Sequence, residues 1–307
     1  MDREILHVCM TMDVERIEAF SPTGGPPDWA FAARSVQSYC NVLAGRGMSA
    51  TLFVVPDTAV EQGALLRQIA EDTGTELGLH MHPQCWKDHH LRVVDYDYFG
   101  GYSGAGQLEI LSEALVQVED LLGDRPRAFR AGNFSANDET FRILGELGFT
   151  HGSVSQPGRS APQYRACWAD ADPDVHFAHD AFRLVAGDLD FVEVPLTSDR
   201  ERTDHWTGVG DVRVEGATPV EIAKAVRQEV GRQVGNDVPV KHVCLLTHNF
   251  VNYWSDQAEE RGRLGVLTEA LDLIDEIADD LGLAVRGSTI GDVRDAFLAA
   301  RGQVKGV

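Results

Sequence analysis

Two pairs of residues that could bind a metal follow apolar runs of this sequence. His80 and His82 lie two apart in "ELGLHMHPQ", and Asp13 and Glu15 lie two apart in "CMTMDVE". Side chains two apart on an extended strand project to the same side, so each pair can act together. Imidazole nitrogens and carboxylate oxygens are ligands for divalent metals, and both groups also transfer protons. We therefore interpret these four residues as a candidate metal and acid–base site.

Arg130 in "FRAGNF" and His248 in "LLTHNF" also follow apolar runs. Beside Asp13, an arginine would hold the carboxylate ionised and lower its pKa. His248 lies where a general acid could reach a leaving group. Each of these residues could also have a purely structural role. Arg130 could form an ordinary salt bridge, and Glu15 could lie in a surface turn. His248, or one or both of His80 and His82, could be core histidines bonded to the backbone.

Apolar runs alternate with longer amphipathic segments along most of the chain. The pattern predicts strands over residues 5–12, 49–55, 76–81, 127–132, 149–155, 190–197, 241–248 and 283–287. It predicts helices over residues 28–47, 57–74, 106–123, 137–148, 218–235 and 261–282, with Asp57 as the N-cap of the second. This alternation is typical of an α/β fold with a parallel sheet, either a barrel or a doubly wound sheet. In both, functional side chains collect at the carboxyl ends of the strands.

Residues 156–190 break the alternation. They contain three prolines and no clear period, which favours an irregular insertion over one mouth of the fold, with a small β-excursion as one alternative. Nothing in the composition marks a linker, so we expect residues 1–307 to form a single domain.

The composition narrows the classes of partner. The chain has 27 basic and 48 acidic residues, which gives a formal net charge of −21. A surface of this charge should repel nucleic acids and anionic membranes. The sequence has neither the basic start of a signal peptide nor an apolar run long enough to span a membrane, so a cytoplasmic enzyme is expected. Its oligomeric state stays open, a homo-oligomer included. Dispersed spacing favours reduced thiols at Cys9, Cys40, Cys85, Cys167 and Cys244.

Taken together, these motifs resemble the polysaccharide deacetylase family, also called carbohydrate esterase family four. "TMDVE", "ELGLHMHPQ", "FRAGNF" and "LLTH" match that family's four motifs in order, and "ATLFVV" before the second motif is also similar. The likeness spans roughly residues 5–290. It implies a deformed (β/α) barrel of about seven parallel strands and a bound divalent metal.

The motifs also depart from the family pattern. The position after Asp13, which usually binds the metal, is Val14 here, so Glu15 would take its place. The second histidine of the family lies four after the first, where this chain has Gln84. The third motif has Ala131-Gly132 where the family often has a proline. The likeness is therefore to a divergent branch with an HxHP second motif.

The resemblance implies a role for each residue of the site. Asp13 would be the base that activates water, Arg130 would orient it, and His248 would protonate the departing amine. His80 and His82 would bind the metal with Glu15 or Asp13; zinc is expected, with cobalt, nickel or manganese as alternatives. The candidate substrate-binding residues are Trp86, Asn133, Phe134 and Asn249.

The expected activity is that of a metal-dependent hydrolase that removes an N-acyl group from a carbohydrate or a sugar-containing small molecule. The expected acyl group is N-acetyl. One alternative keeps the fold and metal but takes a small cyclic amide or ureide, as allantoinase-like relatives do. The other alternative is a catalytically silent carbohydrate-binding homologue, for which Val14 and Gln84 argue.

Overall fold

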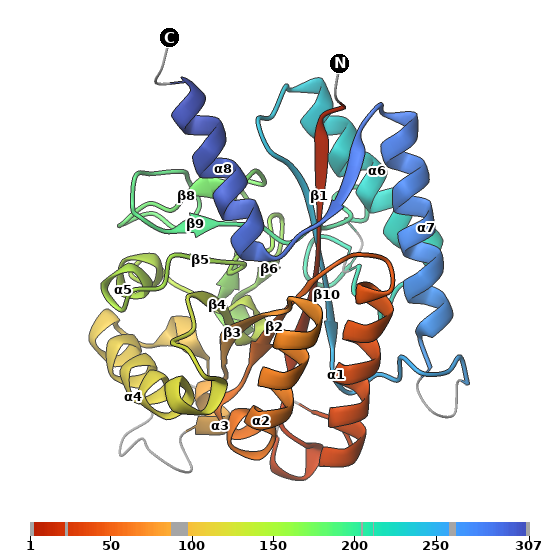
Figure 1. The fold of residues 1–307 in the computed structure, drawn as a ribbon. Coiled ribbons are helices and arrows are strands. Elements are labelled where there is room, and N and C mark those ends of the chain that lie inside the picture. Colours follow the sequence, from red (N-terminus) through yellow and green to blue (C-terminus); the bar gives the residue numbers. More distant parts are fainter. Residues whose placement is uncertain are drawn as a thin grey trace.

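The computed structural model describes residues 3–21, 24–86, 98–203, 205–210, 212–257 and 262–304 (Figure 1). Its main sheet has the strand order β10-β1-β2-β3-β4-β5-β9-β8, and β11 also pairs with β1. Neighbouring strands are parallel from β10 to β9, whereas β8 runs antiparallel to β9. The strands of this sheet are β1 Ile5–Val14, β2 Ala50–Val54, β3 Glu76–Met81, β4 Ala128–Ala131, β5 His151–Gly152, β8 His176–Phe177, β9 Val192–Glu193, β10 Lys241–His248 and β11 Ala284–Gly287.

Helices connect and flank these strands (Figure 1). They are α1 Trp29–Ala44, α2 Pro56–Thr73, α3 Pro83–Trp86, α4 Gly104–Leu122, α5 Thr140–Glu146, α6 Pro219–Gly235, α7 Leu264–Asp280 and α8 Ile290–Val304. The apolar period of α7 explains its position, because Leu267, Leu271 and Ile274 share one buried face. Strands β1 and β10 are mostly apolar and are buried along nearly their whole length, as a parallel sheet with helices outside requires.

The curled sheet is a half-barrel, and irregular backbone completes its wall. Beyond β9, the amide of Leu196 donates to the carbonyl of Ser155 at 3.0 Å, and that of Thr197 donates to the carbonyl of Cys244 on β10 at 2.9 Å. These bonds link the end of the β5 segment to β10 where β9 has already ended. The prediction of a deformed (β/α) barrel of about seven parallel strands is confirmed.

The structure corrects several details of the predicted elements. Val55, not Asp57, is the N-cap of α2; Asp57 instead accepts a bond of 3.1 Å from Arg16. The strands predicted over 149–155 and 190–197 shrink to two residues each, because side chains and irregular bonds replace the regular ladder there. Within 156–190 a two-stranded sheet of β6 Ser160–Ala161 and β7 Ala166–Cys167 forms, and helix α8 follows the last strand unpredicted.

A buried glutamate fastens β5 to β9. Both oxygens of the Glu193 carboxyl group accept from the amide of Val154, and Oε1 also accepts from the amide and hydroxyl of Ser155 at 2.8 and 2.7 Å. This fixes the backbone of Ser153, whose carbonyl accepts from Arg130 at 3.1 Å. Glu193 therefore supports the arginine at the centre of the sheet. Burial raises the pKa of its carboxyl to about 7, although these donors and Arg130 oppose the shift.

We expect this raised pKa to make the stability of the protein depend on pH. The folded state holds the proton of Glu193 more tightly than the unfolded chain, so this stabilisation is complete below pH 4.5 and is lost as the pH rises through about 7. Glu193→Gln removes the titration. Urea unfolding at pH 5 and pH 8 should show wild type losing more stability than the variant, whereas exposed Glu113→Gln should follow wild type. Equal losses for wild type and Glu193→Gln would contradict the assignment.

Candidate active site

The carboxyl ends of β1, β3 and β10 and the turn after β4 surround one small polar pocket. Strand register brings them together, because Asp13 pairs with His248 across β1 and β10, and His80 pairs with Arg130 across β3 and β4. The pocket has a volume of about 100 Å³. Its lining residues are Asp13, Glu15, Gly24, His80, His82, Asn133, Phe134, Arg213, Leu246, His248 and Phe250.

Arg130 lies beneath this pocket, fully buried. Its Nη1 donates to Oδ1 of Asp13 at 2.9 Å and to the hydroxyl of Thr11 at 2.8 Å. The guanidinium also stacks over the ring of Phe53 at 4.3 Å. The arginine thus fixes one oxygen of Asp13 and leaves Oδ2 facing the pocket, 3.6 Å from Nε2 of His80.

Burial raises the pKa of Asp13, but its cationic neighbours outweigh that effect. His80, Arg130 and His248 together bring the pKa of this carboxyl below its ordinary value. Asp13 is therefore held as a carboxylate although it is almost fully buried. Arg130 is thus one of three cationic neighbours that lower the pKa of Asp13.

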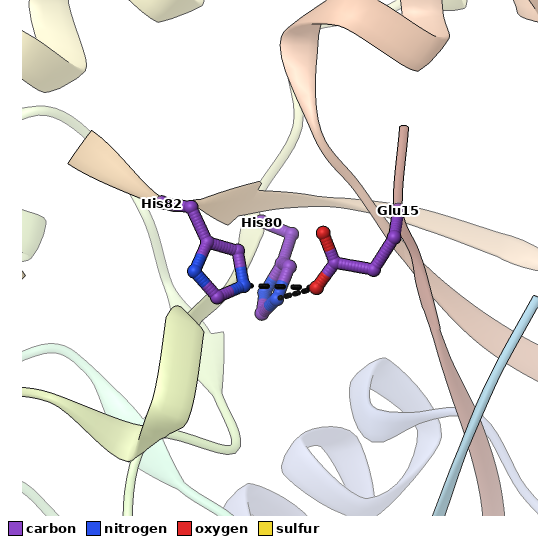
Figure 2. A group of neighbouring side chains, drawn as sticks. All are labelled: Glu15, His80 and His82. Atoms are coloured by element: carbon purple, nitrogen blue, oxygen red, sulfur yellow. Dashed lines mark hydrogen bonds and ion pairs between the residues drawn. The ribbon is translucent and has the colours of Figure 1, made fainter. Parts of the chain in front are cut away.

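Glu15, His80 and His82 form a tight cluster (Figure 2). Oε1 of Glu15 lies 2.8 Å from Nε2 of His82 and 3.4 Å from Nε2 of His80, and one potential ligand atom from each residue lies within 4.8 Å of the others. The two imidazole rings meet edge to face at 4.8 Å. The HxH and DxE spacings therefore bring their side chains together, as the period of an extended strand predicts.

The donor set of this cluster fits a divalent cation. Nδ1 of His80 contacts the carbonyl of Arg130 at 2.9 Å, and because a carbonyl only accepts, Nδ1 carries the proton. In neutral His80 the lone pair of Nε2 then faces the carboxylates of Glu15 and Asp13, which is unfavourable unless a proton or a cation lies between them. Burial lowers the pKa of His80, yet these two carboxylates give it a net upward shift. Oε2 of Glu15 is also buried without a hydrogen bond.

His248 is held at the opposite wall of the pocket. Its Nδ1 lies 2.6 Å from Oε1 of Glu215, and its ring stacks on Phe250 with a centroid separation of 4.8 Å. The other oxygen of Glu215 accepts from Thr247 at 2.8 Å. These contacts leave Nε2 of His248 facing the pocket, 3.9 Å from Oδ2 of Asp13.

Glu215 was not among the residues singled out from the sequence. It lies outside the predicted helices and strands, in a segment that packs along β10 through a bond from the amide of Val214 to the carbonyl of Leu246. The alternation of "VRVE" over 212–215, with buried valines at the first and third positions, was the available signal. Burial raises the pKa of Glu215, but His248 and Arg213 shift it downward overall.

The four candidate substrate-binding residues occupy different environments. Asn133 and Phe134 line the pocket, in a turn where both have a left-handed φ of 57°. Oδ1 of Asn133 is buried without a partner. The side chain of Trp86 lies outside the described part of the structure. The amide of Asn249 is fully buried and bonds the backbone of Glu15 with both of its ends, so it positions Glu15 and does not face the pocket.

Replacing Asn249 should destabilise the end of β1. Its Oδ1 accepts from the amide of Glu15 at 3.0 Å, and its Nδ2 donates to the carbonyl of Glu15 at 2.8 Å. Asn249→Leu leaves both buried backbone groups unpaired, so we expect the free energy of unfolding to fall by about 2–5 kcal/mol in urea titrations. Asn41→Leu, at an exposed position of α1, is the matched control. An equally small effect of both changes would refute this role.

The family model described as polysaccharide deacetylase matches residues 25–152, and no curated protein sequence matches the chain. In the described residues, no helix is sufficiently long and apolar to cross a membrane.

Solved structures share the fold over nearly the whole chain. A protein from Mycobacterium smegmatis assigned to the polysaccharide deacetylases has a TM-score of 0.63 at 19% identity, over 99% of this chain and 92% of that one. The allantoinase Puue has a TM-score of 0.58 at 16% identity, over 97% and 91%. A protein from Pseudomonas aeruginosa PAO1 that is also assigned to the polysaccharide deacetylases has a TM-score of 0.58 at 16% identity, over 97% of this chain and 92% of that one. These structures share the fold, and the family model over residues 25–152 confirms the predicted resemblance to the polysaccharide deacetylases.

Proposed function

We propose that this protein is a metal-dependent hydrolase that cleaves a carbon–nitrogen amide bond. It removes an N-acyl group from a carbohydrate or a sugar-containing small molecule, and N-acetyl is the first candidate for that group. The observation that carries the proposal is the position of Asp13. Its carboxylate lies between a buried arginine, a histidine of the Glu15–His80–His82 cluster and a second histidine on β10.

Glu15, His80 and His82 would hold the metal, and Oδ2 of Asp13 lies beside them, 3.6 Å from Nε2 of His80. Two imidazoles and a carboxylate are a donor set that zinc favours, and cobalt, nickel or manganese are accepted by similar sites. When bound, a divalent cation supplies a Lewis acid that polarises an amide carbonyl and acidifies water.

Asp13 is suited to act as the base. Arg130 holds one carboxylate oxygen, so the other can accept a proton from water as the water oxygen bonds to the amide carbon. His248 is suited to act as the acid, because Glu215 orients its ring with Nε2 toward the pocket. The proton from His248 goes to the amide nitrogen as the carbon–nitrogen bond breaks. The products are a carboxylic acid, acetic acid for an N-acetyl group, and a free amine.

A small cyclic amide or ureide is the second candidate substrate. The small volume of the pocket, about 100 Å³, and the fold shared with an allantoinase favour it. Two assays separate these candidates. One measures the amine released from N-acetylated amino sugars, and the other measures the ring opening of a hydantoin. Glycan binding without turnover in added zinc, cobalt, nickel or manganese would instead support the silent homologue.

Removing the metal should abolish hydrolysis. Dialysis against a chelator is expected to eliminate activity, and zinc is expected to restore it. His80→Ala should lose both bound zinc and activity, the latter by about 1,000-fold or more, because it removes a ligand and the charge stabilisation that depends on it. His179→Ala, at a partly exposed histidine paired with Asp180, serves as the control. Full activity in metal-free wild type or in His80→Ala would overturn the proposal.

Changing Glu215 should separate proton transfer from metal binding. Glu215→Gln keeps a side chain of the same size but loses the carboxylate that orients His248, so kcat should fall by about 100-fold with little change in KM. Zinc content should stay at the wild-type level. A fall in zinc content with unchanged kcat per bound metal would show that Glu215 supports the cluster and not the acid.

A further inference from the structure

The surroundings of His82 contain two features that the proposed reaction does not use. One is Gly132, directly after β4, and the other is Gln84 in α3. Both touch the imidazole of His82, and both stand where the sequence departs from the resembled family pattern. Their contacts explain how an HxH pair can serve as a pair of ligands here.

Gly132 leaves the space that the ring of His82 occupies. A Cβ atom built on Gly132 would lie 2.6 Å from Nε2 of His82 and closer still to Cε1 and Nδ1. Real Cβ atoms essentially never approach a neighbour so closely, so any larger residue at this position displaces the ring. Proline is excluded by the same overlap. The requirement for glycine is therefore steric, because the φ of Gly132 is not in the left-handed region.

Gln84 contacts the same ring at its Nδ1 atom. Its Nε2 lies 3.2 Å from Nδ1 of His82, and the glutamine is 7% exposed. In this orientation the amide donates to Nδ1, so Nε2 of His82 carries the proton and donates to Glu15 at 2.8 Å. That tautomer cannot bind a cation through Nε2.

Rotating the amide of Gln84 by half a turn reverses this arrangement. The oxygen then accepts from Nδ1–H, and the lone pair of Nε2 becomes available beside Glu15 and His80. Oε1 of Gln84 has no hydrogen-bond partner in the present orientation, so the rotation breaks no bond of that oxygen. One glutamine can thus accommodate both tautomers without movement of the histidine ring.

We propose that Gln84 and Gly132 are positioning residues that make His82 a metal ligand, Gly132 by leaving room for the ring and Gln84 by accepting a hydrogen bond from Nδ1. This inference rests on the proposed function, since it assumes the cluster binds a metal. Groups that orient a ligating histidine commonly change metal affinity by about 10–100-fold when they are removed.

Zinc affinity measured by competition with a chromophoric chelator tests the proposal. Gln84→Leu and Gln84→Met, which cannot accept the bond, should bind zinc about 10–100-fold more weakly than wild type. Gln84→Glu should bind at least as tightly, because a carboxylate accepts from Nδ1–H. Gln68→Leu, at a glutamine of α2 paired with Asp72, is the matched control.

Gly132→Ala should weaken zinc binding by at least as much as Gln84→Leu. Gly231→Ala is its control, because a Cβ at that position of α6 meets nothing within 4 Å. Crystal structures of metal-free wild type and metal-free Gly132→Ala give a second readout. Relative to wild type, the ring of His82 should be displaced in the variant, and the ring of His80 should stay in place.

The outcomes distinguish the two proposals. Zinc binding as tight in Gln84→Leu and Gly132→Ala as in wild type would overturn the positioning roles and leave the proposed function standing. An unmoved His82 ring in Gly132→Ala would overturn the steric role by itself. Absence of zinc binding in wild type would overturn the proposed function and, with it, the ligand role of His82.

Discussion

The ion pair between Arg130 and Asp13 is the interaction on which the rest of the site depends. Both side chains are buried, so each charge would be strongly unfavourable without the other. The surrounding structure supports the pair from several sides: the ring of Phe53 covers the guanidinium, which also donates to the hydroxyl of Thr11, the carbonyl of Ser153 and the sulfur of Cys244. Glu193, in turn, holds the segment that contains Ser153.

Much of this arrangement could be predicted from the sequence. Apolar runs that end in Asp13, His80, Arg130 and His248 marked four strand ends, and a parallel sheet brings such ends to one edge. The period of an extended strand placed His80 and His82 on one side, and strand register then set them against Glu15. These inferences depend on local patterns, which a single sequence displays.

The remainder depends on contacts between distant segments that have no local signature. Glu215 reaches His248 only because an irregular segment lies along β10, and Asn249 bonds Glu15 across 234 positions of sequence. The strands at 149–155 and 190–197 were predicted too long, because the carboxyl group of Glu193 replaces ladder bonds that periodicity assumes. The sequence showed at Gly132 only a departure from the family motif. The structure gives the reason, because the ring of His82 occupies the space that a side chain would need.

The pairing of Asp13 with His248 has a consequence for how constant the geometry of the pocket is. The two residues are register partners on adjacent strands, so their backbones are separated by the spacing of a sheet, about 4.8 Å, which hydrogen bonds hold constant. Loops around the rim can alter which molecule enters. They do not change the spacing of the two backbones, from which Asp13 and His248 reach toward each other until Oδ2 and Nε2 lie 3.9 Å apart.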